Sequence, residues 1–137
     1  MKILVDANVL LDYFQHRDGY DNSERILQAC ENGLISGYVA AHSISNMFFI
    51  LRKFYSEEER REILRGIISF LPVVEINHYL VESALSRVDF HDFEDCLQDE
   101  CAIAISADYI VTNNIKDFRQ SKTMAILPKD LVQMISV

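Results

Sequence analysis

Three aspartates occupy positions where a carboxylate could bind a metal ion. Asp6 ends the short apolar run 2–5, Asp95 begins a segment that is apolar almost all round, and Asp117 closely follows the apolar run 109–112. A carboxylate at the end of a buried strand is poorly placed for a surface ion pair, whereas Mg²⁺ and Mn²⁺ prefer the oxygens of carboxylates and water. The three acids therefore predict a site for a hard divalent cation.

Each of these acids also has a structural interpretation. Asp6 could cap the short helix that follows it, and Asp117 alone could be an ordinary turn acid. Asp92 is expected to be the N-cap of its helix, because the D-x-x-D spacing resembles a capping box in which Asp95 is the partner. Asp99 lies four residues beyond Asp95 on the same helical face. It could support the site or be a solvated acid.

Strands and helices alternate along the sequence, and this alternation shows how acids distant in sequence could meet. Expected strands cover residues 2–5, 38–41, 73–76, 109–112 and 123–127, and expected helices cover 7–14, 21–31, 43–55, 57–70, 79–88, 92–105 and a final segment from Pro128. This alternation predicts an α/β fold, namely a three-layer α/β/α sandwich with a central, mostly parallel sheet of about five strands, in one domain of residues 1–137. Ligands of such sheets bind beyond the carboxyl ends of the strands, where Asp6 and Asp117 would lie.

Several helix ends carry local signals of their own. Asn32-Gly33 is typical of a helix C-terminus. Ser56 precedes three glutamates, the pattern of an N-cap followed by acids in the first turn. Asn77 is a second candidate N-cap, and Pro128 suits the first position of the closing helix. These signals predict where individual helices begin and end.

The composition indicates a globular protein of the cytoplasm. Half of the 137 residues are hydrophobic, which is enough to bury a core without disulfides or a structural metal. The three cysteines form no C-x-x-C pair and are expected to be reduced thiols. The sequence shows no signal-peptide pattern and no apolar stretch long enough to span a membrane. We therefore expect a cytoplasmic location and no membrane partner.

The net charge of −8 argues against nonspecific binding of nucleic acid, which depends on basic groups that displace counterions. It does not exclude a nuclease, because a metal ion bound by carboxylates supplies positive charge. The basic residues occur in bunches that are typical of solvated helix faces. Three of them, Arg52, Lys116 and Arg119, could instead contact phosphates of an RNA.

Three segments together resemble a known family. They are ILVDANVLLD (3–12), DFEDCLQ (92–98) and ADYIVTNNIKDF (107–118). In this order and spacing they resemble the successive signatures of PIN domains, in particular the bacterial branch that includes VapC-like toxins. The resemblance covers nearly the full length of the chain. It implies a ribonuclease that depends on Mg²⁺ or Mn²⁺ and is the toxin of a type II toxin–antitoxin system.

The resemblance also implies roles for individual residues and partners for the protein. Asp6, Asp95 and Asp117 take the places of the catalytic, metal-binding acids, while Thr112 and Asn114 take polar positions that shape the same pocket. The implied partners are an RNA substrate, a cognate antitoxin and a second copy of the chain in a homodimer. The acidic cleft would suit a basic antitoxin segment, since arginine pairs well with carboxylates.

The sequence departs from the family at its second acid, which is normally a glutamate early in the helix after the second strand. The matching segment here is HSISNMFF (42–49), and Asn46 or a neighbour fills the place of the acid. Asn46 could still coordinate through its side-chain oxygen, but without charge. The alternative function is therefore a catalytically weakened PIN-like module that binds RNA or protein. The three retained acids argue against it, because their repulsion costs stability unless a cation is present.

Overall fold

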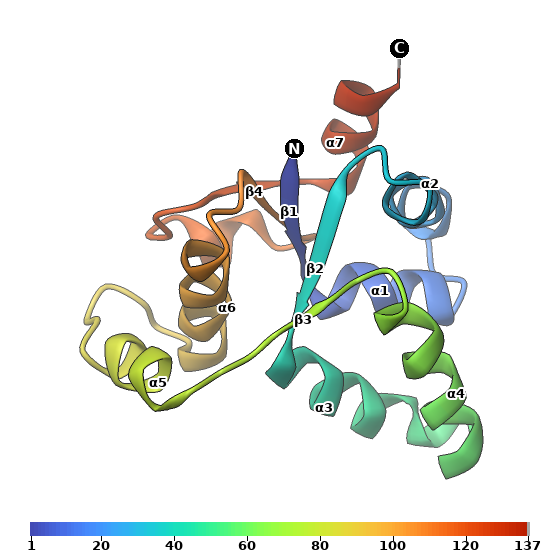
Figure 1. The fold of residues 1–137 in the computed structure, drawn as a ribbon, viewed down its shortest axis with the longest axis horizontal. Coiled ribbons are helices and arrows are strands. Elements are labelled where there is room, and N and C mark those ends of the chain that lie inside the picture. Colours follow the sequence, from blue (N-terminus) through green and yellow to red (C-terminus); the bar gives the residue numbers. More distant parts are fainter. Residues whose placement is uncertain (137) are drawn as a thin grey trace.

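A sheet of parallel strands forms the centre of residues 1–136, the part of the chain that the computed structural model describes (Figure 1). The strands are β1 (Lys2–Val5), β2 (Ser36–Ala40), β3 (Val73–Val74), β4 (Tyr109–Val111) and β5 (Met124–Ile126). Their order across the sheet is β3-β2-β1-β4-β5, and every neighbouring pair is parallel. The prediction of a mostly parallel sheet of about five strands is confirmed, with β1 at its centre.

Helices connect the strands along the whole described chain. They are α1 (Ala7–Phe14), α2 (Tyr20–Glu31), α3 (Ala41–Ile50), α4 (Glu57–Ile68), α5 (His78–Leu85), α6 (Phe93–Ala104) and α7 (Pro128–Ile135). Two short 3₁₀ helices, Leu51–Lys53 and Ile115–Phe118, follow α3 and β4. The predicted helices are all present, and most of their bounds differ by a few residues at most.

The sheet carries a hydrophobic core on each face. In β1, Ile3 and Val5 belong to a core shared with α1, α2, α3, α4 and α7, whereas Leu4 belongs to a second core shared with α5 and α6. Successive side chains of a strand point to opposite faces, so a strand that is covered on both sides must be apolar throughout. Figure 1 shows α5 and α6 on one side of the sheet and α1 to α4 on the other. The predicted α/β/α layering is thereby confirmed.

Side-chain caps fix several helix starts, and one of them lies at the carboxyl end of β1. Asp6 follows β1 directly and accepts a hydrogen bond from the Ala7 amide as the N-cap of α1. Asp92 caps α6 by accepting a bond from the Asp95 amide, and Ser56 forms a full capping box with Glu59. The start of α1 and the end of β4 therefore meet at one edge of the sheet, where a ligand of a parallel sheet is expected.

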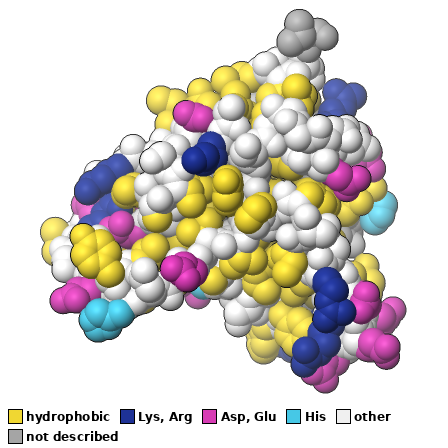
Figure 2. Space-filling view, viewed as in Figure 1, with side chains coloured by type: hydrophobic (Ala, Val, Ile, Leu, Met, Phe, Trp, Pro, Cys, Tyr) yellow, Lys and Arg dark blue, Asp and Glu magenta, His cyan; other side chains and the backbone are white. Residues whose placement is uncertain are grey.

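The surface over α4 carries basic and acidic side chains side by side (Figure 2). Arg61 pairs with Glu57 at 2.9 Å and Arg65 with Glu62 at 3.2 Å, and all four side chains are exposed. This bunch of basic residues is thus a solvated helix face, as expected. The three cysteines are buried free thiols. To cross a membrane, a helix would have to be longer and more apolar than any that residues 1–136 form.

Candidate active site

Asp6 is held by donors from three parts of the fold. Its carboxylate accepts hydrogen bonds from the Ala7 amide at 2.8 Å, from Asn8 at 3.0 Å and from the Thr112 hydroxyl at 2.8 Å. The Gln98 side-chain amide lies 3.5 Å from the same group. Burial raises the pKa of Asp6, and the bonds from Thr112 and Ala7 partly offset this rise. Asp6 is therefore both a helix cap and a carboxylate with a fixed orientation.

Gln98 and Thr112 join Asp6 to the two elements that carry the other predicted acids. Thr112 directly follows β4 and is fully buried. Its hydroxyl oxygen also accepts a hydrogen bond of 3.0 Å from the backbone amide of Asn114. Gln98 lies on α6 three residues after Asp95, which places both on one face of the helix. Sequence analysis did not single out Gln98, although its i, i+3 spacing from Asp95 was a usable signal. β1, β4 and α6 thus converge at Asp6.

Asp95 lies among several other acids of this region. Its side chain is partly buried in the first turn of α6, and within residues 1–136 no group donates a hydrogen bond to its carboxylate. The pKa of Asp95 is raised from 3.8 to about 7, first by burial and then by four nearby carboxylates, those of Asp92, Asp6, Asp117 and Glu94. Asp6 and Asp117 therefore both lie within electrostatic reach of Asp95.

Asp95 and Asp117 line the same cavity. Asp117 is exposed in the 3₁₀ helix Ile115–Phe118, just after β4. The cavity has a volume of about 250 Å³, and the cationic side chains of Lys116 and Arg119 also line it. The remaining lining residues are Asp89, Phe90, His91, Asp92 and Gln120. Carboxylates and basic groups therefore share one hollow, an arrangement that could bind a cation and a phosphate together.

Arg52 is not among the residues that line this cavity. Its guanidinium lies 3.6 Å from the centre of the Phe49 ring, and it donates to the Phe49 carbonyl at 2.9 Å. Of the three predicted RNA-contacting residues, Lys116 and Arg119 thus lie beside the acids. Arg52 instead lies in the 3₁₀ helix that follows α3, against the Phe49 ring.

Asn46 faces the start of α6. Its side-chain amide donates to the Glu94 carboxylate at 3.2 Å, and the His42 ring lies 3.2 Å from the Glu94 backbone carbonyl. Burial lowers the pKa of His42, and the negative charges of Glu94 and Asp6 oppose this effect. Neither His42 nor Glu94 was predicted to neighbour the site, because no spacing in the sequence joins α3 to α6. The Glu94 carboxylate therefore lies beside Asn46, one of the residues that the resemblance puts at the place of an absent glutamate.

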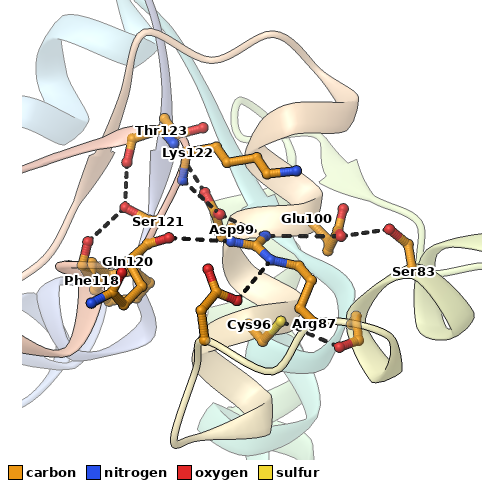
Figure 3. A network of polar contacts seen from close by, with 12 residues as sticks. Ser83, Arg87, Cys96, Asp99, Glu100, Phe118, Gln120, Ser121, Lys122 and Thr123 are labelled. Atoms are coloured by element: carbon orange, nitrogen blue, oxygen red, sulfur yellow. Dashed lines mark hydrogen bonds and ion pairs between the residues drawn. The ribbon is translucent and has the colours of Figure 1, made fainter.

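Asp99 does not belong to this cluster in the way that we expected (Figure 3). It is fully buried, so it is not a solvated acid. Its carboxylate accepts hydrogen bonds from Arg87 at 2.8 Å and from the backbone amides of Lys122 at 2.9 Å and Thr123 at 3.1 Å. Asp99 therefore anchors α6 to Arg87 and to residues 122–123, and it does not line the cavity that Asp95 and Asp117 share.

The donor set fits a divalent cation that is held partly by other ligands. In residues 1–136, no three His, Cys, Asp or Glu side chains stand close enough to hold a metal ion by themselves. Mg²⁺ in particular is commonly bound by one or two carboxylates, with water and substrate phosphate completing its coordination. Asp95 suits this mode because its carboxylate has no protein donor and is surrounded by like charges. A bound cation would relieve that repulsion.

Loss of the α6 cap should lower the stability of the fold while leaving Mn²⁺ affinity nearly unchanged. Asp92→Ala removes the acceptor for the Asp95 amide, which lies 3.1 Å from the Asp92 carboxylate. We expect the free energy of unfolding to fall by about 1 kcal/mol, the usual cost of losing an N-cap. Urea denaturation of the two proteins measures this difference. A variant with reduced Mn²⁺ affinity and unchanged stability would instead place Asp92 among the ligands.

The raised pKa of Asp95 predicts a pH dependence of stability in the metal-free protein. Since this pKa is about 7 in the folded state and 3.8 ordinarily, the folded protein binds the extra proton between about pH 4 and 7. The free energy of unfolding should therefore fall as pH rises through this window. Asp95→Asn should flatten the dependence and be more stable than the wild type at pH 8 by about 1 to 2 kcal/mol, after allowance for solvent screening. Urea denaturation in EDTA at several pH values tests this, and parallel curves for the two proteins would contradict it.

Comparison with known proteins identifies the family. A family model described as the PIN domain matches residues 2–116. By sequence, no curated protein gives a match. Among solved structures, a toxin–antitoxin complex from Klebsiella pneumoniae is 20% identical, with 92% of this chain and 97% of that chain covered and a TM-score of 0.70. VapBC2 of Rickettsia felis, bound to a DNA fragment from its promoter, is 18% identical, with 93% and 98% covered and a TM-score of 0.69.

A third similar structure is VapC20 of Mycobacterium tuberculosis, described as a toxin that cleaves the sarcin-ricin loop. It is 14% identical, with 79% of this chain and 86% of that chain covered and a TM-score of 0.62. At these identities the structural likeness concerns the fold. The family model, in contrast, covers most of the sequence, including the segments that carry Asp6 and Asp95. The chain belongs to the PIN domain family.

Proposed function

We propose that this protein is an endoribonuclease that depends on Mg²⁺ or Mn²⁺ and uses Asp6, Asp95 and Asp117 as its metal-binding acids. The observation that carries the proposal is the convergence of these acids from three elements. Asp95 and Asp117 line one cavity, and Asp6 contacts α6 through Gln98 and the end of β4 through Thr112. The PIN family membership and the VapC fold of the similar structures support the same assignment.

The residues of the cavity suit hydrolysis of a phosphodiester. A bound divalent cation would lower the pKa of a water molecule and neutralise charge on the scissile phosphate. Asp6 would present a carboxylate whose orientation Thr112 and Asn8 already fix. Lys116 and Arg119 line the same cavity and would contact flanking phosphates of the RNA. Such a reaction requires no nucleophilic side chain.

We further propose that the protein is the toxin of a toxin–antitoxin pair and forms a homodimer. The similar structures from Rickettsia felis and Klebsiella pneumoniae are toxin–antitoxin complexes, which supports the first part of this proposal. The carboxylates of the cavity would attract an arginine of the antitoxin, because a guanidinium pairs bidentately with a carboxylate. Co-expression with the product of the neighbouring gene, followed by size-exclusion chromatography with light scattering, tests both the partner and the dimer.

Calorimetric titration with Mn²⁺ tests the metal site directly. We expect the wild type to bind Mn²⁺, and a concentration of roughly 100 times the dissociation constant should raise the free energy of unfolding by about 2.7 kcal/mol. Asp6→Asn should bind much more weakly, since it removes one charged ligand. Asp18→Asn is the matched control, because Asp18 is exposed in the loop between α1 and α2 and does not line the cavity. Equal binding by Asp6→Asn and the wild type would remove Asp6 from the site.

The weakened, non-catalytic PIN module predicts a different result. A module of that kind would bind RNA without cleaving it, whether or not Mn²⁺ is present. Incubation of the wild type with single-stranded RNA and Mn²⁺ therefore separates the two functions. Cleavage that EDTA abolishes supports the nuclease, and binding without cleavage supports the module.

A further inference from the structure

Arg87 occupies the centre of a polar network beside the candidate active site (Figure 3). It lies two residues after α5, and its side chain is only 9% exposed. One guanidinium nitrogen donates to the Asp99 carboxylate on α6 at 2.8 Å, and another donates to the Gln120 backbone carbonyl at 3.3 Å. The Glu100 carboxylate lies 3.8 Å away. A single buried side chain thus contacts α6 and the segment that follows Asp117.

The same guanidinium also contacts the segment between α5 and α6. Its Nε lies 3.6 Å from the Asp89 carboxylate, and its central carbon lies 4.9 Å from the centre of the Phe90 ring. Asp89 and Phe90 line the cavity on one side, and Gln120 lines it as part of the segment that carries Asp117. We call residues 89–92 the first wall of the cavity and residues 116–120 the second wall. Arg87 contacts both.

α6 anchors this arrangement from behind. The Asp99 carboxylate that binds Arg87 also accepts hydrogen bonds from the backbone amides of Lys122 and Thr123, which lie just beyond the second wall. Asp95, one of the proposed metal ligands, lies on the same helix, three residues after the end of the first wall. The two walls also touch directly, since the Phe90 and Phe118 rings pack edge to face with their centres 6.4 Å apart. The guanidinium adds polar contacts to this apolar one, and a packed polar network allows few alternative positions of the groups that it joins.

The contacts of residue 87 with both walls depend on the shape of the arginine side chain. Its planar guanidinium carries donors in several fixed directions, whereas lysine carries one compact charge on a flexible stem. A lysine at position 87 could neutralise Asp99, but it could not also reach the Gln120 carbonyl and the first wall. Arg87→Lys should therefore keep the charge that neutralises Asp99 but lose the contacts that join the two walls.

We infer that Arg87 is a positioning residue of the proposed nuclease, which holds the two walls at the separation that lets Asp95 and Asp117 share one metal ion. This inference rests on the proposed function. It assigns Arg87 no contact with the substrate or the metal. Its effect would pass through the first wall to Asp95 and through Gln120 to Asp117.

The test compares Arg87→Lys with the wild type and with Arg61→Lys, whose arginine belongs to an exposed ion pair on α4. We expect Arg87→Lys to bind Mn²⁺ about 10-fold more weakly in calorimetry, the usual scale for residues that orient metal ligands. The increase in Tm on addition of a fixed concentration of Mn²⁺ should shrink accordingly. Hydrogen exchange of backbone amides should become faster in the two walls. Arg61→Lys should match the wild type in all three measurements.

Each other outcome also decides the inference. Unchanged Mn²⁺ affinity in a folded Arg87→Lys would overturn it, even if exchange became faster, because Arg87 would then be structural only. If Arg87→Lys does not fold, Phe90→Leu loosens the first wall without a change of charge, and unchanged Mn²⁺ affinity in that variant would overturn the inference. If the wild type binds no Mn²⁺, the proposed function fails. Hydrogen exchange then tests only whether Arg87 holds the two walls together. Faster exchange in the walls of the variant supports this role, and exchange equal to that of the wild type refutes it.

Discussion

Asp95→Asn is expected to lower the rate of RNA cleavage by about 1000-fold in the presence of Mn²⁺. The carboxylate of Asp95 lies in the first turn of α6, lines the cavity with Asp117 and accepts no hydrogen bond from residues 1–136. Its charge is therefore free for a cation. Loss of that ligand removes several kcal/mol of stabilisation from the reaction, and about 4 kcal/mol corresponds to a factor of 1000 in rate. Cleavage of a single-stranded RNA by equal amounts of each protein measures the effect.

The fold should not be the cause of this loss. Asp95→Asn relieves repulsion from neighbouring carboxylates, so the metal-free variant should be at least as stable as the wild type near pH 8. Asp18→Asn is the matched control, since it removes the charge of an exposed acid that does not line the cavity and should retain the activity. Cleavage at the wild-type rate by Asp95→Asn would show that the catalytic acids lie elsewhere.

The parts of the fold that the sequence predicted well are those with local signals. Asp6 both ends β1 and caps α1, so the bounds of these two elements follow from a single residue. Ser56 caps α4 and Asn77 caps α5, both as expected. Gly33 has a φ of +76°, which glycine accepts at the end of a helix. Each of these signals acts through neighbours within four residues. A single sequence is sufficient to read them.

The bounds that differed belong to elements without such signals. The helix expected at 43–55 begins at Ala41, directly after β2, and its N-cap Ala40 offers no side-chain bond. It also ends at Ile50, where a 3₁₀ turn takes over the remaining residues. The strand expected at 73–76 is limited to Val73 and Val74, because it pairs only with β2 at the edge of the sheet. Tertiary contacts rather than local preferences set these limits.

In the candidate site, too, residues with local sequence signals could be predicted, whereas those placed by tertiary contacts could not. Asp6, Asp95 and Asp117 could be predicted because each follows an apolar run or begins a helix. Asp99 was misread because α6 is buried almost all round, so a residue on its acidic face need not reach solvent. The partner of Asp99 is Arg87, which lies in a loop before the helix. No periodicity in the sequence links the two, and only the packing of the loop against α6 brings them together.

Arg87→Met is expected to be the most destabilising of the substitutions considered for this protein, at about 3 to 5 kcal/mol of unfolding free energy. The variant removes the cation but leaves Asp99 fully buried with only two backbone amides as donors. A buried carboxylate without a counter-charge must either stay ionised in a poor environment or bind a proton, and both states cost free energy. Urea denaturation at pH 7 measures the difference from the wild type.

Two further variants separate the cost of a stranded charge from the loss of packing. Arg61→Met removes an arginine from an exposed pair and should change stability little, since such pairs are screened by solvent. Arg87→Met combined with Asp99→Leu removes both charges and should recover a large part of the loss, because the buried acid is no longer unpaired. A double variant as unstable as Arg87→Met would show that the cost comes from the contacts of the guanidinium with the two walls. The network in Figure 3 would then stabilise the fold through its geometry rather than through the neutralisation of Asp99.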